Sequence, residues 1–304
     1  MQFLQGNYAL ALESHQRSLN LYDLSGAKEG QAFALHSIGI IQRVYGNYEQ
    51  ALDYFQKSLA LTESLGRKDL ASRSLSSIGA VYGLLGNHAQ ALNYHEKSIK
   101  VGESTGSRFW TIFSLNSMGE IYRSQGQFSQ ALVHLERALR ISEELKYNDR
   151  IAYVCISIGD IKYLEGDYLK AIEFGERAMA IARQTSSRDA LWKALTLAGR
   201  AYYALNQREK AQLLLVEATN TVEVLRSNVA GQELRSTYFA TVQYPYEVLV
   251  DFLMQRHKQD PSDDNDVLAL HVNERALARS LLEALSEANT DIRKGVDPLL
   301  LERE

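Results

Sequence analysis

The sequence predicts an all-α solenoid in which antiparallel helix pairs stack side by side through a 40-residue repeat. Three observations predict it: a short motif recurs every 40 residues, the apolar residues around each copy follow helical spacing, and only 3 prolines occur in 304 residues. Because proline interrupts helices, its scarcity favours long uninterrupted helical segments. Self-similarity at a fixed period is the signature of repeat architectures, so the repeat decides the fold class.

The repeated motif is a glycine, a polar residue and usually an aromatic residue, followed three residues later by an Ala-Leu or Ala-Ile pair. Its copies begin at Gly6, Gly46, Gly86, Gly126 and Gly166, and a sixth copy without the glycine begins at Asn206. We therefore predict an array over 1–225 and a helical extension over 227–304. The predicted units are 1–26, which is truncated in its first helix, then 27–66, 67–106, 107–146, 147–186 and 187–226.

Each unit is predicted to hold two helices. Leu75, Ile78, Gly79 and Tyr82 fall at positions i, i+3, i+4 and i+7, which form one stripe of a helix. A glycine-containing turn follows, and a second helix begins near Ala91. The small residues allow the two backbones to approach closely, and neighbouring pairs must stack because one pair cannot bury its apolar faces alone.

The Leu, Gly and Tyr positions of the first helix and the Ala-rich second helix resemble the tetratricopeptide repeat over residues 1 to 225. This resemblance implies a right-handed superhelix of helix pairs that binds a protein or peptide on its concave face. The usual repeat is about 34 residues long, so the longer unit is similar to the variants in kinesin light chain and bacterial signalling proteins. The chain departs from the pattern in lacking the terminal proline and in placing Gln42 and Lys162 where tyrosine is expected.

The C-terminal third loses the strict period. A long helix kinked at Pro245 is predicted over 233–258, a polar loop over 259–266, and another helix over 267–288.

Three segments, 233–243, 274–276 and 291–298, resemble the connector that follows the repeats in CHAT proteins, which are bacterial and carry a caspase-like domain at the C-terminal end. We expect that domain to begin near Glu304, and the family's His–Cys pair has no counterpart in this sequence. The resemblance implies a regulatory module of a CHAT protease system. A peptide-sensing signalling regulator, whose array changes its superhelical pitch on binding, is the alternative.

The composition narrows the partners. The net charge of −4 argues against nucleic acid and against an anionic membrane surface, both of which require a basic surface. There is one cysteine, no run of about 18 apolar residues and no signal-peptide pattern. We therefore expect a cytoplasmic protein whose partner is another protein or a peptide.

No catalytic site, metal site or cofactor site is predicted. Cys155 occupies a core position of a first helix, His88 and His95 lack a third ligand, and the recurring glycines lack the Lys-Ser/Thr of a phosphate loop. The acidic run at 260–266 lacks the glycine of a calcium loop. The sequence therefore favours a binding protein over an enzyme.

The predicted binding surface is the concave face, formed by exposed first-helix positions in the 40-residue register. Aromatic residues and arginine dominate binding hot spots in protein interfaces. The candidates are Phe33, His36, Arg43, Arg73, Phe113, Asn116, Arg123, Tyr153, Tyr163, Lys193, Arg200 and Tyr203. Serines at 37, 77, 117 and 157 replace the residues of a chaperone-tail carboxylate clamp, so we discount that mode of binding.

Overall fold

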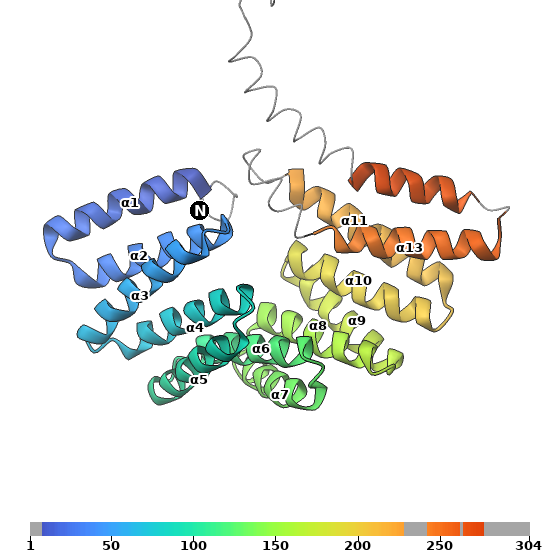
Figure 1. Ribbon diagram of the computed structural model, residues 1–304. Coiled ribbons are helices and arrows are strands. Elements are labelled where there is room, and N and C mark those ends of the chain that lie inside the picture. Colours follow the sequence, from blue (N-terminus) through green and yellow to red (C-terminus); the bar gives the residue numbers. More distant parts are fainter. Residues whose placement is uncertain (1–7, 228–241, 262–263, 277–304) are drawn as a thin grey trace, which may run out of the picture.

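The computed structural model describes residues 8–227, 242–261 and 264–276, and these ranges contain helices, short turns and no β-strand. The helices form an arc in which consecutive helices pair (Figure 1). They are α1 (Tyr8–Ser25), α2 (Lys28–Val44), α3 (Tyr48–Ser64), α4 (Lys68–Leu84), α5 (His88–Thr105), α6 (Arg108–Ser124), α7 (Phe128–Glu144), α8 (Asn148–Leu164), α9 (Tyr168–Gln184), α10 (Arg188–Ala204), α11 (Arg208–Ser227) and α13 (Tyr244–Gln259). The predicted all-α solenoid is confirmed.

A turn residue with positive φ recurs at every twentieth position from Gly26 to Asn206. Most of these positions are glycine, which adopts the left-handed region without steric cost. Lys146 and Ser186 hold the same conformation at φ 55°, although their side chains disfavour it. The even spacing of the turns gives the helices of the repeats nearly equal lengths and keeps the 40-residue register.

A bulky side chain of the second helix fits over a glycine of the first helix in most pairs. A Cβ atom placed on Gly119 would lie 2.5 Å from Cγ of Leu135, and one on Gly79 would lie 2.9 Å from Cε1 of His95. Phe55 covers Gly39 and Leu215 covers Gly199 in the same register. In the unit 147–186, Gly175 occupies the position equivalent to Leu135 and has no side chain to cover Gly159. Leu197 of the next unit fills the space over Gly159 instead.

The even-numbered helices from α2 to α10 line the inside of the arc, whereas α5 and α7 lie on its outer side (Figure 1). The core between them is shared by neighbouring units. One cluster joins Ile112 and Leu115 of α6 and Leu135 of α7 to Val154 and Ile158 of α8. Each unit therefore completes the hydrophobic core of the next, as expected for a solenoid.

Two buried serines make the same contact one repeat apart. Ser58 Oγ donates to the carbonyl oxygen of Ala32 at 2.8 Å, and Ser98 Oγ donates to that of Ser72, also at 2.8 Å. Both hydroxyls are fully buried, and these bonds satisfy them.

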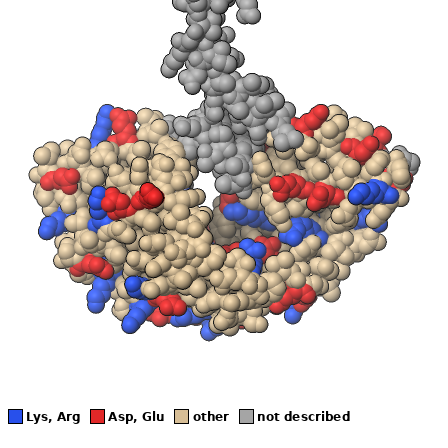
Figure 2. Space-filling view, in the orientation of Figure 1, with Lys and Arg blue, Asp and Glu red and all other residues tan. Residues whose placement is uncertain are grey.

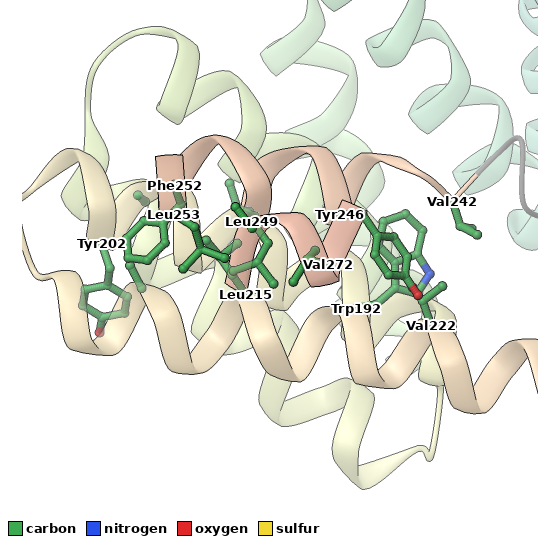
Figure 3. Close-up of a cluster of buried hydrophobic side chains, with 14 of the residues drawn as sticks. Trp192, Tyr202, Leu215, Val222, Val242, Tyr246, Leu249, Phe252, Leu253 and Val272 are labelled. Atoms are coloured by element: carbon green, nitrogen blue, oxygen red, sulfur yellow. The ribbon is translucent and has the colours of Figure 1, made fainter. Parts of the chain in front are cut away.

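The C-terminal helices continue the core. Tyr246, Leu249, Phe252 and Leu253 of α13 pack with Leu215 and other residues of α10 and α11, and Val272 of the helical segment 265–276 joins the same cluster (Figure 3). In the part of the chain that the structure describes, we find no helix with the length and hydropathy that a membrane crossing requires.

The predicted kink at Pro245 is wrong. Val242 and Gln243 are not helical, and α13 begins at Tyr244, so Pro245 occupies its first turn. A proline at this position loses no helical hydrogen bond, because the first N–H groups of a helix have no partner within it. The remaining parts of the two predicted C-terminal helices, 233–241 and 277–288, lie outside the described residues.

The glycine contacts yield a matched pair of substitutions. Gly119→Ala should destabilise the fold by about 1–3 kcal/mol, because the new methyl group overlaps Leu135 in a filled core. Gly83→Ala should instead stabilise it by up to about 1 kcal/mol, because a Cβ there meets only the Ala91 Cβ at 4.0 Å and alanine favours the helix. Urea denaturation measures both changes, and shifts of the same sign would contradict the packing described above.

His95 should make the fold sensitive to acid. Its ring is 1% exposed, and burial lowers its pKa from 6.5 to about 4. Between pH 6.5 and pH 4 the His95 ring is protonated in the unfolded chain but stays neutral in the fold. The free energy of unfolding is therefore unaffected by this group above pH 6.5 and falls as the pH drops towards 4. The loss between about pH 7 and about pH 5 should amount to about 2 kcal/mol from this group.

Replacing the ring tests this assignment. His95→Leu places the residue found at positions 135 and 215 over Gly79, so urea midpoints of the variant should fall less on acidification than those of the wild type. An equal fall in both proteins would show that His95 does not titrate in the fold.

Candidate functional site

A pocket of 490 Å³ opens on the concave face between α6, α8 and α10, with one residue from α13. Figure 2 shows the hollow between the two arms of the arc, where basic and acidic side chains gather. The lining residues are Asn116, Glu120 and Arg123 of α6, Tyr153, Ile156, Ser157 and Asp160 of α8, Trp192, Lys193, Thr196, Leu197 and Arg200 of α10, and Tyr244 of α13.

Asp189, in the first turn of α10, organises one wall of this pocket. Its carboxylate accepts hydrogen bonds from the Tyr153 hydroxyl at 2.7 Å, from Lys193 Nζ at 2.6 Å and from Trp192 Nε1 at 3.2 Å. Burial and the neighbouring Asp189 charge raise the pKa of Tyr153, so its hydroxyl stays protonated. Three large side chains are thereby held in fixed positions, with the aromatic surfaces of Tyr153 and Trp192 at the pocket.

Arg200 stands at the opposite end, between two tyrosines. Its guanidinium carbon lies 4.0 Å from the centroid of the Tyr163 ring and 5.5 Å from that of Tyr244. The nearest carboxylate contact is loose, with Nη1 at 3.8 Å from Asp160 Oδ1. Among the described residues no hydrogen bond is made by this guanidinium, so its N–H groups can serve a ligand.

Asp160 lies at the polar centre of the pocket, near Arg123 and Arg200. Burial raises the pKa of Asp160, Arg123 and Arg200 lower it, and Glu120 adds to the increase, so the net shift is upward. Arg123 is itself engaged by Glu120, whose Oε2 accepts from Nε at 3.0 Å and from Nη2 at 2.5 Å. The two arginines therefore compensate the Asp160 charge only in part.

The pocket combines these charges with amide, hydroxyl and apolar groups. Ser157 Oγ donates to Asn116 Oδ1 at a long 3.4 Å, and Ile156 and Leu197 supply apolar surface. Such a site can pair with either charge, exchange hydrogen bonds with a peptide backbone and cover an apolar side chain, which are the demands of a peptide ligand.

The structure brings several of the candidate residues together. Asn116, Arg123, Tyr153, Lys193 and Arg200 all line the pocket. Tyr163 lies beside it and stacks on Arg200. Tyr203 points instead to the C-terminal extension, where its ring lies 4.9 Å from that of Phe252 and its hydroxyl donates to Gln255.

The other five candidates lie outside this pocket, four of them on α2 and α4. Phe33, His36 and Arg43 are on α2, Arg73 is on α4 and Phe113 is on α6. The predicted exposure of His36 is wrong: its ring packs 5.0 Å from that of Phe55 and the residue is 2% exposed, whereas Phe33 is 51% exposed. Trp110 joins two of these residues, because its ring lies 6.4 Å from that of His36 and 6.0 Å from that of Phe113, and the Arg73 guanidinium lies 5.4 Å from the Phe33 ring.

The 40-residue register also places Glu120, Ile156, Asp160 and Thr196 on this face, but sequence reasoning missed Trp192, Leu197 and Tyr244 as pocket residues. Trp192 and Leu197 also pack in the core cluster with α13, and large apolar residues at such positions are typical of the core rather than of a binding surface. Tyr244 lies beyond the repeats, where the 40-residue register places no residue, and only the packing of α13 brings it to the pocket. The adjacent Pro245, which marks a helix start, was the available signal.

Cys155 and His95 do not line the pocket. Burial raises the pKa of the Cys155 thiol to about 11, so the thiolate form is suppressed at neutral pH. His95 is enclosed under Gly79. Within 8–227, 242–261 and 264–276, no three His, Cys, Asp or Glu side chains gather in the way that metal ligands do.

The raised pKa of Asp160 predicts a stability effect of definite sign. Because the fold disfavours the ionised form, the stability contributed by Asp160 is present below its ordinary pKa of 3.8 and lost as the pH rises through the folded value. Asp160→Asn, which cannot ionise, should therefore melt at a higher temperature than the wild type at neutral pH, and the gap should close in acid.

Asp53→Asn is the matched control, because Asp53 is exposed on the outer helix α3 and its partner Lys57 lies 2.7 Å away. It should give no increase in melting temperature at neutral pH. A lower melting temperature for Asp160→Asn would show instead that the two arginines overcompensate the buried charge.

Solved structures of low sequence identity share this architecture. BtubC (BKLC) from P. vanneervenii superposes with a TM-score of 0.61 at 18% identity, over 72% of this chain and 92% of that one. A Rap protein complexed with Competence and Sporulation Factor gives 0.58 at 14% identity, over 93% of this chain and 88% of that one. NprR in complex with its cognate peptide NprX gives 0.56 at 16% identity, over 100% of this chain and 87% of that one.

No curated protein sequence matches the chain. The tetratricopeptide repeat model, in contrast, matches residues 1–64, 70–144 and 151–223, which is most of the sequence. Among the described residues, these segments fall on the helices α1 to α11. The chain therefore belongs to the tetratricopeptide repeat family.

Proposed function

We propose that this protein binds a peptide, or an extended segment of a protein, along its concave face, with the pocket between α6, α8 and α10 as the main anchor site. The observation that carries the proposal is Arg200, a guanidinium held between Tyr163 and Tyr244 with only a 3.8 Å contact to a carboxylate. An arginine positioned by aromatic rings with unused N–H groups is a typical hot spot for recognition.

The pocket is also preorganised, which reduces the entropic cost of binding. Asp189 fixes Tyr153, Trp192 and Lys193, and the C-terminal helix α13 supports the opposite end through Tyr244. The likeness to NprR, crystallised with its cognate peptide, and to a Rap protein, crystallised with Competence and Sporulation Factor, supports a peptide ligand.

The function that we propose is binding rather than catalysis. The thiol of Cys155 is enclosed in the core, and the pocket residues are those of a recognition surface: aromatic rings, guanidinium groups, an amide and a hydroxyl. We place this activity in the cytoplasm, with no metal, no cofactor, no nucleic acid and no membrane partner.

For the biological setting, we propose a regulatory module of a CHAT caspase-like protease system. Its support is the likeness of segments 233–243, 274–276 and 291–298 to the CHAT connector, most of which lies outside the described residues. The likeness to NprR, described as a quorum sensor, and to the Rap protein favours the alternative of a peptide-sensing regulator.

Arg200→Ala should weaken peptide binding by about 2 kcal/mol, or about 30-fold in Kd, because the central anchor is lost. Peptides selected from a displayed random library on the wild-type protein provide the ligands. Fluorescence anisotropy with a labelled selected peptide measures the Kd, and circular dichroism checks that the helices persist.

Arg177→Ala is the matched control. Arg177 lies on the outer helix α9 and pairs with Glu143 at 2.5 Å, so its loss removes the same charge without touching the pocket. The control should bind as the wild type does. Equal affinity of the folded Arg200→Ala protein would move the binding site away from the pocket.

Two further measurements distinguish the CHAT module from the peptide-sensing regulator. A change in radius of gyration on binding the selected peptide, measured by small-angle X-ray scattering, would support the sensing regulator. A caspase-like domain with its His–Cys pair, encoded after Glu304 or by a separate gene whose product binds this array, would support the CHAT module.

A further inference from the structure

Two arginines and a histidine on the inner helices α2 and α4 form no ion pair with a carboxylate among the described residues. These are His36, Arg43 and Arg73, which we name the basic cluster. They influence one another electrostatically, since Arg73 and Arg43 both contribute to lowering the pKa of His36, after burial itself. Burial likewise lowers the pKa of Arg43 and of Arg73, so the fold bears a cost for holding charge here.

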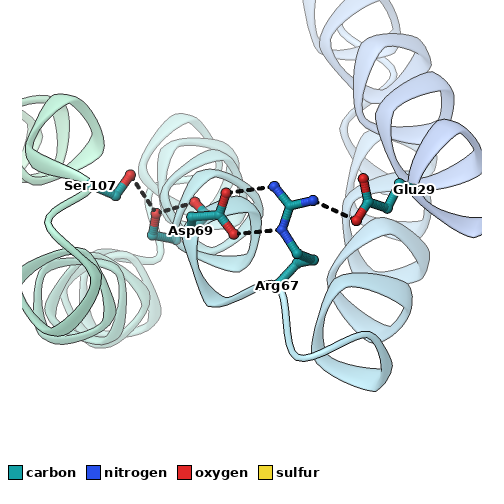
Figure 4. Close-up of polar contacts among 5 residues, drawn as sticks. Glu29, Arg67, Asp69 and Ser107 are labelled. Atoms are coloured by element: carbon teal, nitrogen blue, oxygen red, sulfur yellow. Dashed lines mark hydrogen bonds and ion pairs between the residues drawn. The ribbon is translucent and has the colours of Figure 1, made fainter.

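The nearby carboxylates are already engaged by another arginine. Arg67 donates to Asp69 through Nε at 3.0 Å and Nη2 at 2.8 Å, and to Glu29 through Nη1 at 2.5 Å (Figure 4). Asp69 therefore acts on Arg73 only as a neighbouring charge and accepts no hydrogen bond from it. The carboxylates of Asp69 and Glu29 are therefore hydrogen-bonded to Arg67 and not to the basic cluster.

The basic cluster also contains orphaned polar atoms. Nε and Nη2 of Arg73, and both ring nitrogens of His36, are buried without a hydrogen-bond partner within the described part of the chain. Most buried polar groups in proteins are paired, and an unpaired buried donor is costly, so such a group calls for an explanation. A ligand that supplies acceptors would satisfy several of these atoms at once.

Aromatic surface surrounds the basic cluster. The Arg73 guanidinium lies 5.4 Å from the centroid of the Phe33 ring, which is 51% exposed. Trp110 lies against His36 and Phe113, at 6.4 Å and 6.0 Å between ring centroids. A ligand anion at this position would therefore have apolar neighbours.

We propose that the basic cluster is a subsite for an acidic side chain of the bound peptide, which is received by Arg73 beside His36 and Arg43 and is flanked by an apolar residue over Phe33 and Trp110. This inference rests on the proposed function and specifies the charge and the position of one residue of the bound peptide. The acidic residue of the partner lies on α2 and α4, and the rest of the peptide continues towards the Arg200 pocket. A carboxylate fits better than a phosphate, because a dianion would lose more hydration among these aromatic rings.

The two tryptophans of the chain report on the two places separately. Trp110 contacts His36 in the basic cluster, and Trp192 lines the Arg200 pocket. Labelling with fluorotryptophan therefore yields two fluorine NMR resonances, one for each place, in the intact protein. Trp110→Phe assigns them by removing one resonance.

The probes are three capped tripeptides, Phe-Glu-Phe, Phe-Gln-Phe and Phe-phosphoserine-Phe. The Glu peptide should shift the Trp110 resonance saturably, and the uncharged Gln peptide should bind at least about tenfold more weakly. Arg73→Gln should weaken the Glu peptide by at least about tenfold while raising the melting temperature, because an unpaired buried charge is removed. Arg137→Gln, which breaks an exposed pair with Glu103 on the outer helices, should leave the affinity unchanged.

Equal affinity of the Glu and Gln peptides, or an unaltered Glu affinity in folded Arg73→Gln protein, would overturn the subsite. So would tighter binding of the phosphoserine peptide, or no response of Trp110 to millimolar Glu peptide. Failure of the proposed function is seen separately: library-selected peptides would then leave the Trp192 resonance unmoved. A Trp192 response without a Trp110 response overturns only the acidic subsite.

Discussion

The contact between a bulky side chain on one helix and a glycine on its partner is the constraint on which the rest of the structure depends. It brings two backbones close enough that Phe55, His95 and Leu135 enter the surface of the preceding helix. The same contact sets the pair geometry in successive units, and turns at every twentieth residue keep the register. In the unit where Gly175 stands at the bulky position, Leu197 of the next unit packs over the glycine of the first helix. The contact is thus preserved with a side chain from a different unit.

The recognition surface follows from this stacking. Residues 40 apart in the sequence occupy equivalent positions on adjacent inner helices, so Tyr153 and Lys193 become neighbours, with the Lys193 ammonium 5.3 Å from the tyrosine ring. The outer surface uses the same register for ion pairs between units, such as Arg183 with Glu217 at 2.8 Å. The inner surface differs because Arg73 forms no ion pair and Arg200 has only a loose one among the described residues, although Arg123 is paired with Glu120. Arginines on the inner surface that form no close ion pair contribute little to stability, and they are the charges that a binding partner can engage.

The two inner sites differ in their electrostatic balance. The pocket near Arg200 contains acids and bases that partly neutralise one another around Asp160. The basic cluster on α2 and α4 forms no ion pair, because Arg67 takes the hydrogen bonds of both Asp69 and Glu29, and Asp69 acts on Arg73 only as a neighbouring charge. A ligand that spans the concave face would meet a positive end without ion pairs and a mixed, aromatic centre, and this asymmetry can define its orientation.

The sequence by itself determined the helix pairs, their period and the side of each helix that faces the groove, because these depend on local spacing and on close contacts within one unit. It placed Asn116, Arg123, Tyr153, Lys193 and Arg200 on one surface for the same reason. Only the tertiary structure decided which of the candidates share a pocket, since that depends on the curvature of the stack. It also turned Tyr203 towards α13 and brought Tyr244 to Arg200. Those contacts join segments about 40 to 50 residues apart through the packing of a helix that follows no repeat, and no period in a sequence encodes such a contact.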